Sequence, residues 1–233
     1  MIEFLKRLLF VRKCLFCGEL LAETKEDVFC PKCRLEYEKM KRRACSICGK
    51  PHDRCGCMPM KLKPLADSAV HLFAYEDSYS KTLVFRLKRK DCRPLQLFLG
   101  KELAEVLGDV SGYAVTYAPR TQQSVRKYGF DQAKALAGVI GEEKGIPLVE
   151  IFSHAGFSKL QKNLNAEQRL ENAEKSYTLR KHFVREHDRL LIVDDVMTTG
   201  STMAKLVSLA KEAGYQTVTV VCVAMTVHER ERE

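Results

Sequence analysis

The fold of this chain is decided by the stretch Leu190-Leu191-Ile192-Val193-Asp194-Asp195-Val196-Met197-Thr198-Thr199-Gly200-Ser201-Thr202. Four branched or leucine side chains lead into an acidic pair, a pattern typical of a buried parallel strand that ends in a loop. Residues 201–213 continue with helical spacing, for which Ser201 or Thr202 is the expected N-cap and Gly214 the expected end. Because residues 217–224 form another apolar run, the stretch predicts a βαβ unit with a right-handed crossover.

The loop of this unit has the residues of a phosphate-binding site. Main-chain N–H groups at a helix N-terminus attract an anion, and the glycine lets the backbone approach it closely. The two acids lie just before the loop, where their carboxylates can accept hydrogen bonds from neighbouring ribose hydroxyls. The stretch resembles the phosphoribosyl-pyrophosphate (PRPP) motif of type I phosphoribosyltransferases over thirteen residues. The expected PRPP-binding residues are Asp194, Asp195, Val196, Met197, Thr198, Thr199, Gly200, Ser201, Thr202 and, from another loop, Arg120. A hydroxyl-rich loop that binds nothing, or binds another phosphate, is the alternative.

Eight of the ten cysteines fall before residue 58, in closely spaced pairs. Such pairs let both thiolates reach one tetrahedral zinc ion. The expected metal ligands are Cys14, Cys17, Cys30, Cys33, Cys45, Cys48, Cys55 and Cys57. We expect two zinc ions, and the spacing alone allows either sequential or cross-braced pairing of the cysteines. His52 is a further candidate ligand, although a surface histidine is the simpler interpretation.

Charge and hydropathy limit the compartment and the partners. No secretory signal is evident in the first residues, so we expect a cytoplasmic protein in which disulfides are disfavoured. No apolar stretch reaches the length of a membrane span. The formal net charge is +9, which makes nucleic acid a candidate partner, whereas a solvated charged surface is the alternative.

A length of 233 residues suits one medium domain and a small one. We expect a zinc-binding module at residues 1–63 and an α/β domain at residues 64–233, because prolines and spaced lysines mark the joint. Strands that alternate with helices predict a parallel sheet flanked by helices. The expected strands are residues 68–75 and 114–118, and the expected helices are residues 78–88, 95–107 and 131–144.

Two loops are expected to converge on the phosphate site, since ligands of parallel sheets bind at the carboxyl ends of the strands. In residues 118–130, Arg120, Arg126 and Lys127 are candidates to bind a diphosphate or a nucleic-acid backbone, and Phe130 is a candidate to stack on a base. The second loop, residues 157–169, is polar and long enough to close over a ligand, and a mobile solvated loop is its alternative.

With these residues in hand, the chain resembles the ComF family of competence-associated, phosphoribosyltransferase-like proteins. The resemblance rests on the cysteine pairs, Leu87-Lys88, the run from Arg126 to Gln132, and the Asp-Asp-x-x-Thr-Thr-Gly-x-Thr loop. Residues 161–172 match the family more loosely. The resemblance implies a double zinc ribbon followed by a type I phosphoribosyltransferase fold. It also implies a role in handling incoming single-stranded DNA in naturally transformable bacteria.

Three functions are compatible with these features. In the first, the chain has a PRPP site and handles single-stranded DNA through Lys88, Arg126, Lys127 and Phe130. Because the sequence has no GxxxxGK[ST] motif for nucleotide binding, a helicase or translocase partner would supply the energy for DNA movement. The second is an active phosphoribosyltransferase that uses Mg²⁺ with PRPP. In that case Asp194 and Asp195 fix the ribose, and Arg126 is among the residues that stabilise the departing diphosphate. The third is a regulatory protein that senses PRPP.

Overall fold

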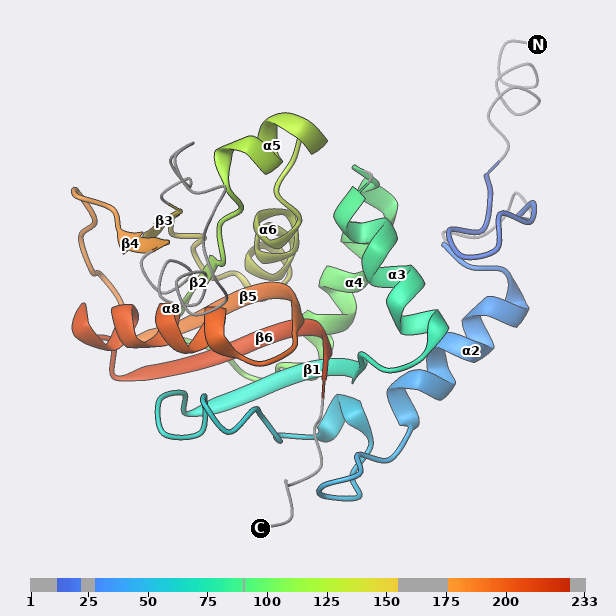
Figure 1. The fold of residues 1–233 in the computed structure, drawn as a ribbon, viewed down its shortest axis with the longest axis horizontal. Coiled ribbons are helices and arrows are strands. Elements are labelled where there is room, and N and C mark those ends of the chain that lie inside the picture. Colours follow the sequence, from blue (N-terminus) through green and yellow to red (C-terminus); the bar gives the residue numbers. More distant parts are fainter. Residues whose placement is uncertain (1–11, 22–27, 90, 155–175, 227–233) are drawn as a thin grey trace, which may run out of the picture.

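The computed structural model describes residues 12–21, 28–89, 91–154 and 176–226 (Figure 1). Its elements, in chain order, are α2 (Pro31–Arg42), the 3-10 turn η1 (His52–Arg54), β1 (Ser68–Ala74), α3 (Ser78–Arg89), α4 (Arg93–Val106), β2 (Tyr113–Tyr117), α5 (Gln122–Tyr128), α6 (Gln132–Lys144), β3 (Phe152–His154), β4 (Tyr177–Leu179), β5 (Arg189–Met197), α8 (Ser201–Glu212) and β6 (Thr217–Met225).

The central sheet has four parallel strands in the order β1-β6-β5-β2. The register places Leu191 of β5 beside Thr219 of β6 on one side and beside Val115 of β2 on the other. Leu148 extends the β2 edge through a parallel bridge to Val115. A separate antiparallel pair, β3 and β4, lies next to this sheet (Figure 1). The predicted α/β class, a parallel sheet flanked by helices, is confirmed.

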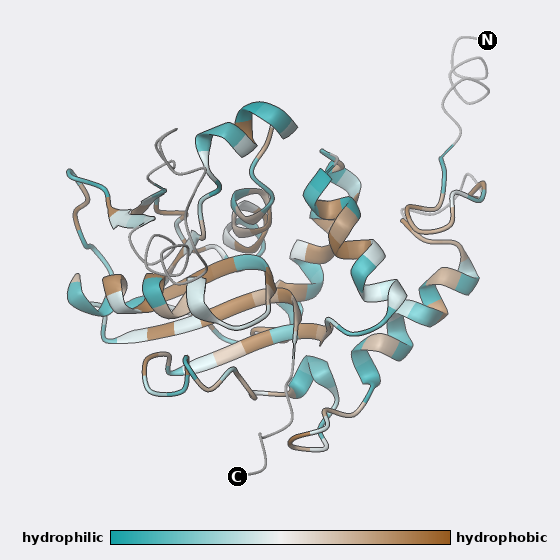
Figure 2. Ribbon diagram, viewed as in Figure 1, coloured by the Kyte–Doolittle hydropathy of each residue, from teal (hydrophilic) through white to brown (hydrophobic). Residues whose placement is uncertain are grey.

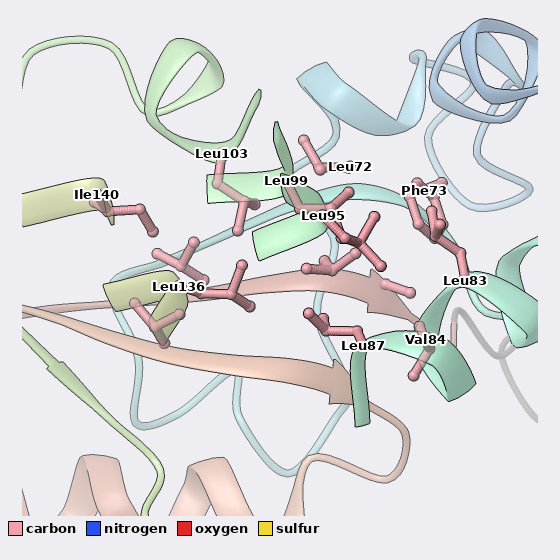
Figure 3. Close-up of a cluster of buried hydrophobic side chains, with 14 of the residues drawn as sticks. Leu72, Phe73, Leu83, Val84, Leu87, Leu95, Leu99, Leu103, Leu136 and Ile140 are labelled. Atoms are coloured by element: carbon pink, nitrogen blue, oxygen red, sulfur yellow. The ribbon is translucent and has the colours of Figure 1, made fainter. Parts of the chain in front are cut away.

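Helices cover both faces of the sheet, which explains the four consecutive buried residues at the start of β5. Successive strand residues point to opposite faces. Leu191 and Val193 pack with α3, α4 and α6, whereas Leu190 and Ile192 pack with α8. Figure 3 shows the leucines of α3 and α4 meeting Leu136 and Ile140 of α6 over the face that carries Leu191 and Val193, which we call the first face. In Figure 2 the inner strands are hydrophobic along most of their length.

The contact between α4 and α6 depends on a glycine. A Cβ atom on Gly100 of α4 would lie 2.6 Å from the Cβ of Val139 of α6. We expect Gly100→Ala to lower the free energy of unfolding by about 1–3 kcal/mol, because the helices would have to separate. Gly138→Ala is the matched control, since nothing lies within 4 Å of its added Cβ, and it should be neutral or stabilising. Equal urea midpoints for Gly100→Ala and the native chain would contradict the packing described here.

The cysteine-rich segment shares its core with the α/β domain. Phe29 and Tyr37 are buried in the same cluster as Leu72 and Phe73 of β1. The Tyr37 hydroxyl donates to the Glu102 carboxylate of α4 at 3.1 Å, and Lys41 forms an ion pair with the same carboxylate. Through these contacts α2 packs against the helices and strand on the first face of the sheet.

Five elements predicted from the sequence, and the final strand, are confirmed within two residues. Residues 118–130, expected to be a loop, instead contain α5. The Thr121 side chain caps this helix by accepting from the Ser124 N–H, and Gly129, with φ of 80°, ends it. Neither α2 nor the continuation of β5 through Met197 was expected. The predicted loop at residues 157–169 lies outside the described residues. Within the described part of the chain, no helix is both long and apolar enough to cross a membrane.

Candidate functional site

The two adjacent acids of β5 point to opposite faces of the sheet. Asp195 is 2% exposed and turns toward the helices of the first face. Its carboxylate accepts a hydrogen bond from Gln132 Nε2 at 2.9 Å and lies 3.4 Å from Lys88 Nζ. The sequence predicts that both carboxylates accept hydrogen bonds from a ribose at the strand end, whereas in the structure the Asp195 carboxylate is buried and contacted by Gln132 and Lys88. Strand geometry is the reason, because the continuation of β5 through Met197 keeps the alternation of side chains intact.

Asp194 is partly buried on the face that carries α8. The Asp195 N–H donates to its carboxylate at 2.8 Å. Burial raises the pKa of Asp194 well above its usual range, and the neighbouring Asp195 charge adds to the effect. Burial, followed by the charge of Asp194, also raises the pKa of Tyr177 of β4 to about 12. Tyr177 packs against the cluster that contains the buried side chains of α8, so the β3–β4 pair lies beside this helix.

The turn between β5 and α8 is the predicted phosphate loop. Thr198 and Thr199 are exposed, and Gly200 is the N-cap with φ of 74°, a conformation that favours glycine. The prediction of Ser201 or Thr202 as the N-cap is therefore wrong. Gly200 carries no side chain to cap the helix, whereas Thr121 caps α5 and Asp131 caps α6.

The uncapped start of α8 leaves main-chain donors free. The N–H groups of Thr202 and Met203 have no hydrogen-bond partner among the described residues. Such donors suit an anion. Val196 and Met197, by contrast, belong to β5, and Met197 is buried in the core. The loop available to a phosphate is therefore shorter than predicted and runs from Thr198 to Thr202.

Three sequence motifs meet at Asp195. Lys88 ends the Leu-Lys pair of α3, and Gln132 ends the run that begins at Arg126. Both side chains contact the carboxylate of Asp195, although 107 and 63 residues separate them from it in the sequence. The Oε1 atom of Gln132 is buried and has no partner among the described residues. Lys88, predicted to contact nucleic acid, therefore also positions a carboxylate of the site.

A second cluster joins α3 to α5. The Arg120 guanidinium donates to the Lys88 carbonyl oxygen at 2.8 Å and lies over the rings of Tyr128, at 5.2 Å, and Phe130, at 5.3 Å. Lys127 Nζ is 5.3 Å from the centre of the Tyr128 ring. We call these five residues the Arg120 cluster. Arg120, predicted to bind PRPP, is held by these contacts, and its guanidinium covers one face of the Phe130 ring.

Several residues around this cluster are exposed to solvent, where a ligand can contact them. Arg126 and Lys127 are exposed on α5, which Figure 2 shows as a hydrophilic helix. Phe85 of α3 is 54% exposed, and the Arg89 guanidinium lies 4.8 Å from the centre of its ring. Phe85 was not among the predicted site residues. It lies next to apolar Val84 in the helix, and the sequence pattern does not show that Val84 is buried while Phe85 is exposed.

The eight cysteines form two groups in the order of the chain. One group is Cys14, Cys17, Cys30 and Cys33, and the other is Cys45, Cys48, Cys55 and Cys57. In each group the sulfur atoms all lie within 4.8 Å of one another. The pairing is therefore sequential, the simpler of the two arrangements that the spacing allowed. His52 belongs to neither group; it is buried, and its Nδ1 lies 3.1 Å from Nε2 of His71.

Both groups fit tetrahedral zinc. Zinc–sulfur bonds of about 2.3 Å place sulfur atoms about 3.8 Å apart in a tetrahedron. Cys17 and Cys30 have their sulfur atoms 3.7 Å apart, and the Cys48–Cys55 distance is 3.5 Å. Main-chain N–H groups point at two of the sulfurs, from Phe16 to Cys14 and from Cys57 to Cys55. Left-handed glycines, Gly18 and Gly49, follow the first pair of each group and close the turn.

Comparisons with known proteins find two domain models and one curated relative that match this chain. Residues 5–62 match the model of the double zinc ribbon domain, and residues 124–233 match that of the phosphoribosyl transferase domain. Competence protein ComFC of Streptococcus pneumoniae is 25% identical over 220 residues, which cover 88% of this chain and 96% of that protein.

Three solved structures match part of this chain. The allosteric regulatory enzyme of purine biosynthesis is 23% identical, with a TM-score of 0.39, and the match covers 55% of this chain but only 25% of that one. A purine phosphoribosyltransferase from Pyrococcus horikoshii Ot3 is 20% identical with a TM-score of 0.33, over 58% of this chain and 79% of that one. An orotate phosphoribosyltransferase from Aeropyrum pernix is 19% identical with a TM-score of 0.30, over 55% and 56%.

The parallel sheet, the two cysteine groups and the two domain models all agree with the sequence match along most of the chain. This chain is a homologue of ComFC, in which a double zinc ribbon domain precedes a phosphoribosyl transferase domain.

Proposed function

We propose that this chain binds a phosphoribosyl ligand of the PRPP class and handles single-stranded DNA during competence. The observation that carries the proposal is the end of β5, where a partly buried carboxylate at Asp194 adjoins exposed hydroxyls and the uncapped N-terminus of α8. The name of the Streptococcus pneumoniae relative supports the role in competence. In this proposal, residues 1–63 form the zinc module and residues 64–233 form the ligand-binding domain.

The loop supplies the contacts that a ribose 5-phosphate needs. Free N–H groups at the helix start and the hydroxyls of Thr198, Thr199 and Ser201 can donate to phosphate oxygens. Asp194 can accept from a ribose hydroxyl at the same strand end. Asp195, held by Gln132 and Lys88, is the second acceptor, and a ligand would reach it by displacing the half-exposed Lys88 side chain.

Mg²⁺ fits this site as a companion of the ligand. Mg²⁺ is usually bound by one or two carboxylates together with substrate phosphates and water. Among the described residues, the only groups of three or more metal-binding side chains are the cysteine groups. The diphosphate and hydroxyls of the ligand would therefore provide most of the oxygen ligands, with Asp194 as the nearest carboxylate of the loop.

Calorimetric titration of Mg²⁺-PRPP into the zinc-loaded chain tests this site. We expect saturable binding with one ligand per chain, and ribose 5-phosphate should bind more weakly because it lacks the diphosphate. Heats no larger than those of dilution, for a protein that melts cooperatively, would overturn the PRPP part of the proposal.

The Arg120 cluster and α5 support the nucleic-acid part. Lys88, Arg120, Arg126 and Lys127 bring four cationic side chains to one region, and Tyr128 and Phe130 interleave aromatic rings with them. Surfaces that combine cations with aromatic rings hold single strands by phosphate contacts and base stacking. Because Arg120 covers one face of Phe130, a base would use the opposite face or the more exposed ring of Phe85.

Removing two exposed charges of α5 should weaken oligonucleotide binding in a salt-dependent way. For Arg126→Ala/Lys127→Ala we expect the slope of log K against log salt to fall in magnitude by about 1.4, since each single-strand phosphate contact contributes about 0.7. Lys101→Ala/Lys181→Ala removes two charges elsewhere and should leave the slope unchanged. Equal slopes for both double variants, measured by fluorescence anisotropy, would place the DNA surface elsewhere.

The match to the phosphoribosyl transferase model favours a second candidate, an active transferase. In that reaction an acceptor would form a bond to the anomeric carbon of PRPP, and the diphosphate would leave with the electron pair of the broken C–O bond. Exposed Arg126 would neutralise the departing charge. A screen of nucleobases and amines for diphosphate release tests this candidate, and a protein that binds PRPP without releasing diphosphate would exclude those acceptors. PRPP-dependent capture of a partner protein would instead indicate a sensor.

A further inference from the structure

The segment that follows the last zinc ligand lies against the phosphate loop. Cys57 is two residues before Pro59, and the side chain of Pro59 fills the space beside Gly200. A Cβ atom on Gly200 would lie 3.0 Å from the Cβ of Pro59 and 3.6 Å from Cδ1 of Leu62. Leu62 is fully buried in the same cluster as Met197 and Met203. The residues between the zinc module and β1 are thus packed onto the loop rather than forming a free linker.

This segment brings a positive charge to the start of α8. Lys61 Nζ donates to Ser201 Oγ at 3.3 Å, across 140 residues of sequence. No carboxylate of the described residues is within ion-pair distance of this ammonium group. Ser201 is the first residue of α8, beside the unpaired N–H groups of Thr202 and Met203. Within the described part of the chain, an ammonium group without a carboxylate partner and two amides without an acceptor therefore lie beside Ser201.

We propose that Lys61 is a phosphate-binding residue, delivered to the loop by the second zinc site. It would contact the 5-phosphate of the phosphoribosyl ligand, so this inference rests on the proposed function and assigns a further residue of that site. A lysine acts on phosphate as a compact positive charge. Packing of Leu62 and Pro59 holds its backbone in place, and metal binding at Cys57 fixes the chain just before it.

The inference gives the zinc module a direct part in ligand binding. The last cysteine of the module, Cys57, lies four residues before Lys61, so the cysteines determine where the lysine is presented. Lys63 lies two residues further along, is also exposed, and makes no hydrogen bond or ion pair with the loop among the described residues. The two lysines therefore form a matched pair of the same charge and nearly the same position.

Calorimetry on Lys61→Ala and Lys63→Ala, with Mg²⁺-PRPP and with ribose 5-phosphate, tests the assignment. We expect Lys61→Ala to weaken both ligands by about tenfold, as for the loss of one charged hydrogen bond, and Lys63→Ala to weaken neither. The thermal midpoint should be the same for both variants, since each removes an exposed side chain.

Equal affinities for Lys61→Ala and Lys63→Ala would overturn the inference while leaving the proposed site intact. A loss confined to PRPP would also overturn it, because Lys61 would then contact the diphosphate. Failure of the unmodified chain to bind either ligand would instead count against the proposed function.

Discussion

Zinc removal is expected to unfold the N-terminal module and to destabilise the whole chain by more than about 4 kcal/mol, beyond the range of ordinary single substitutions. Cys14, Cys30 and Cys33 are buried among the side chains that join the module to β1 and α4. Without the metal, these thiols lose the bonds that hold a small apolar core together. The chelator should therefore lower the thermal midpoint and the helical circular dichroism together.

Substitution of one ligand gives the matched test. Cys30→Ser should release zinc and reproduce the effect of the chelator, whereas Cys92→Ser, outside both cysteine groups, should retain two zinc ions and a midpoint close to that of the native chain. Zinc release can be measured with a colorimetric indicator during unfolding. A chain that lost all its zinc and kept its midpoint would show that the cysteines have another role.

The two acids of β5 should give opposite effects on stability and the same loss of ligand. Asp195→Asn should lower the free energy of unfolding by about 1–3 kcal/mol, because a buried charged hydrogen bond to Gln132 and the contact with Lys88 are weakened. Asp194→Asn should leave stability unchanged or increase it, since it removes a carboxylate that burial and Asp195 disfavour. Both variants should bind Mg²⁺-PRPP at least about tenfold more weakly.

The stability of Asp194→Asn should also depend less on pH. The pKa of Asp194 is raised in the folded chain, so the folded state binds more protons than the unfolded state between the two pKa values. Stability from this group is therefore present at a pH below the unfolded pKa and is lost as the pH rises through the folded pKa. Urea unfolding of the native chain and Asp194→Asn across this range should converge at low pH. Parallel curves, or a destabilised Asp194→Asn variant that still binds PRPP, would contradict these roles.

Local patterns were enough to predict the sheet and the metal ligands. The apolar run before Asp194 and the helical spacing after Gly200 predicted β5 and α8, and paired cysteines predicted the two zinc groups. The end of β5 was placed too early because a carboxylate pair is unusual inside a strand. Pairing of Met197 with Met225 on β6 extends the strand, and such pairing depends on a neighbour that the local pattern does not identify.

The remaining site residues are brought together by tertiary structure. Gln132 belongs to a sequence motif, yet its contact with Asp195 requires α6 to pack on the first face of the sheet. Lys61 was seen only as part of a joint, because its contact with Ser201 spans 140 residues. The exposure of Phe85 likewise depends on how α3 is packed. Sequence patterns predict elements, whereas these contacts depend on where distant elements meet.

The most direct test of the account is the fluorescence anisotropy of a labelled single-stranded oligonucleotide. The zinc-loaded chain would be titrated at two salt concentrations, with and without Mg²⁺-PRPP. Phosphate contacts make binding strongest at low salt, so we expect affinity that falls with salt. We also expect it to change when PRPP binds, because Lys88 of the Arg120 cluster contacts Asp195 at the end of β5. No binding at low salt, with PRPP or without it, would contradict the proposed DNA-handling function.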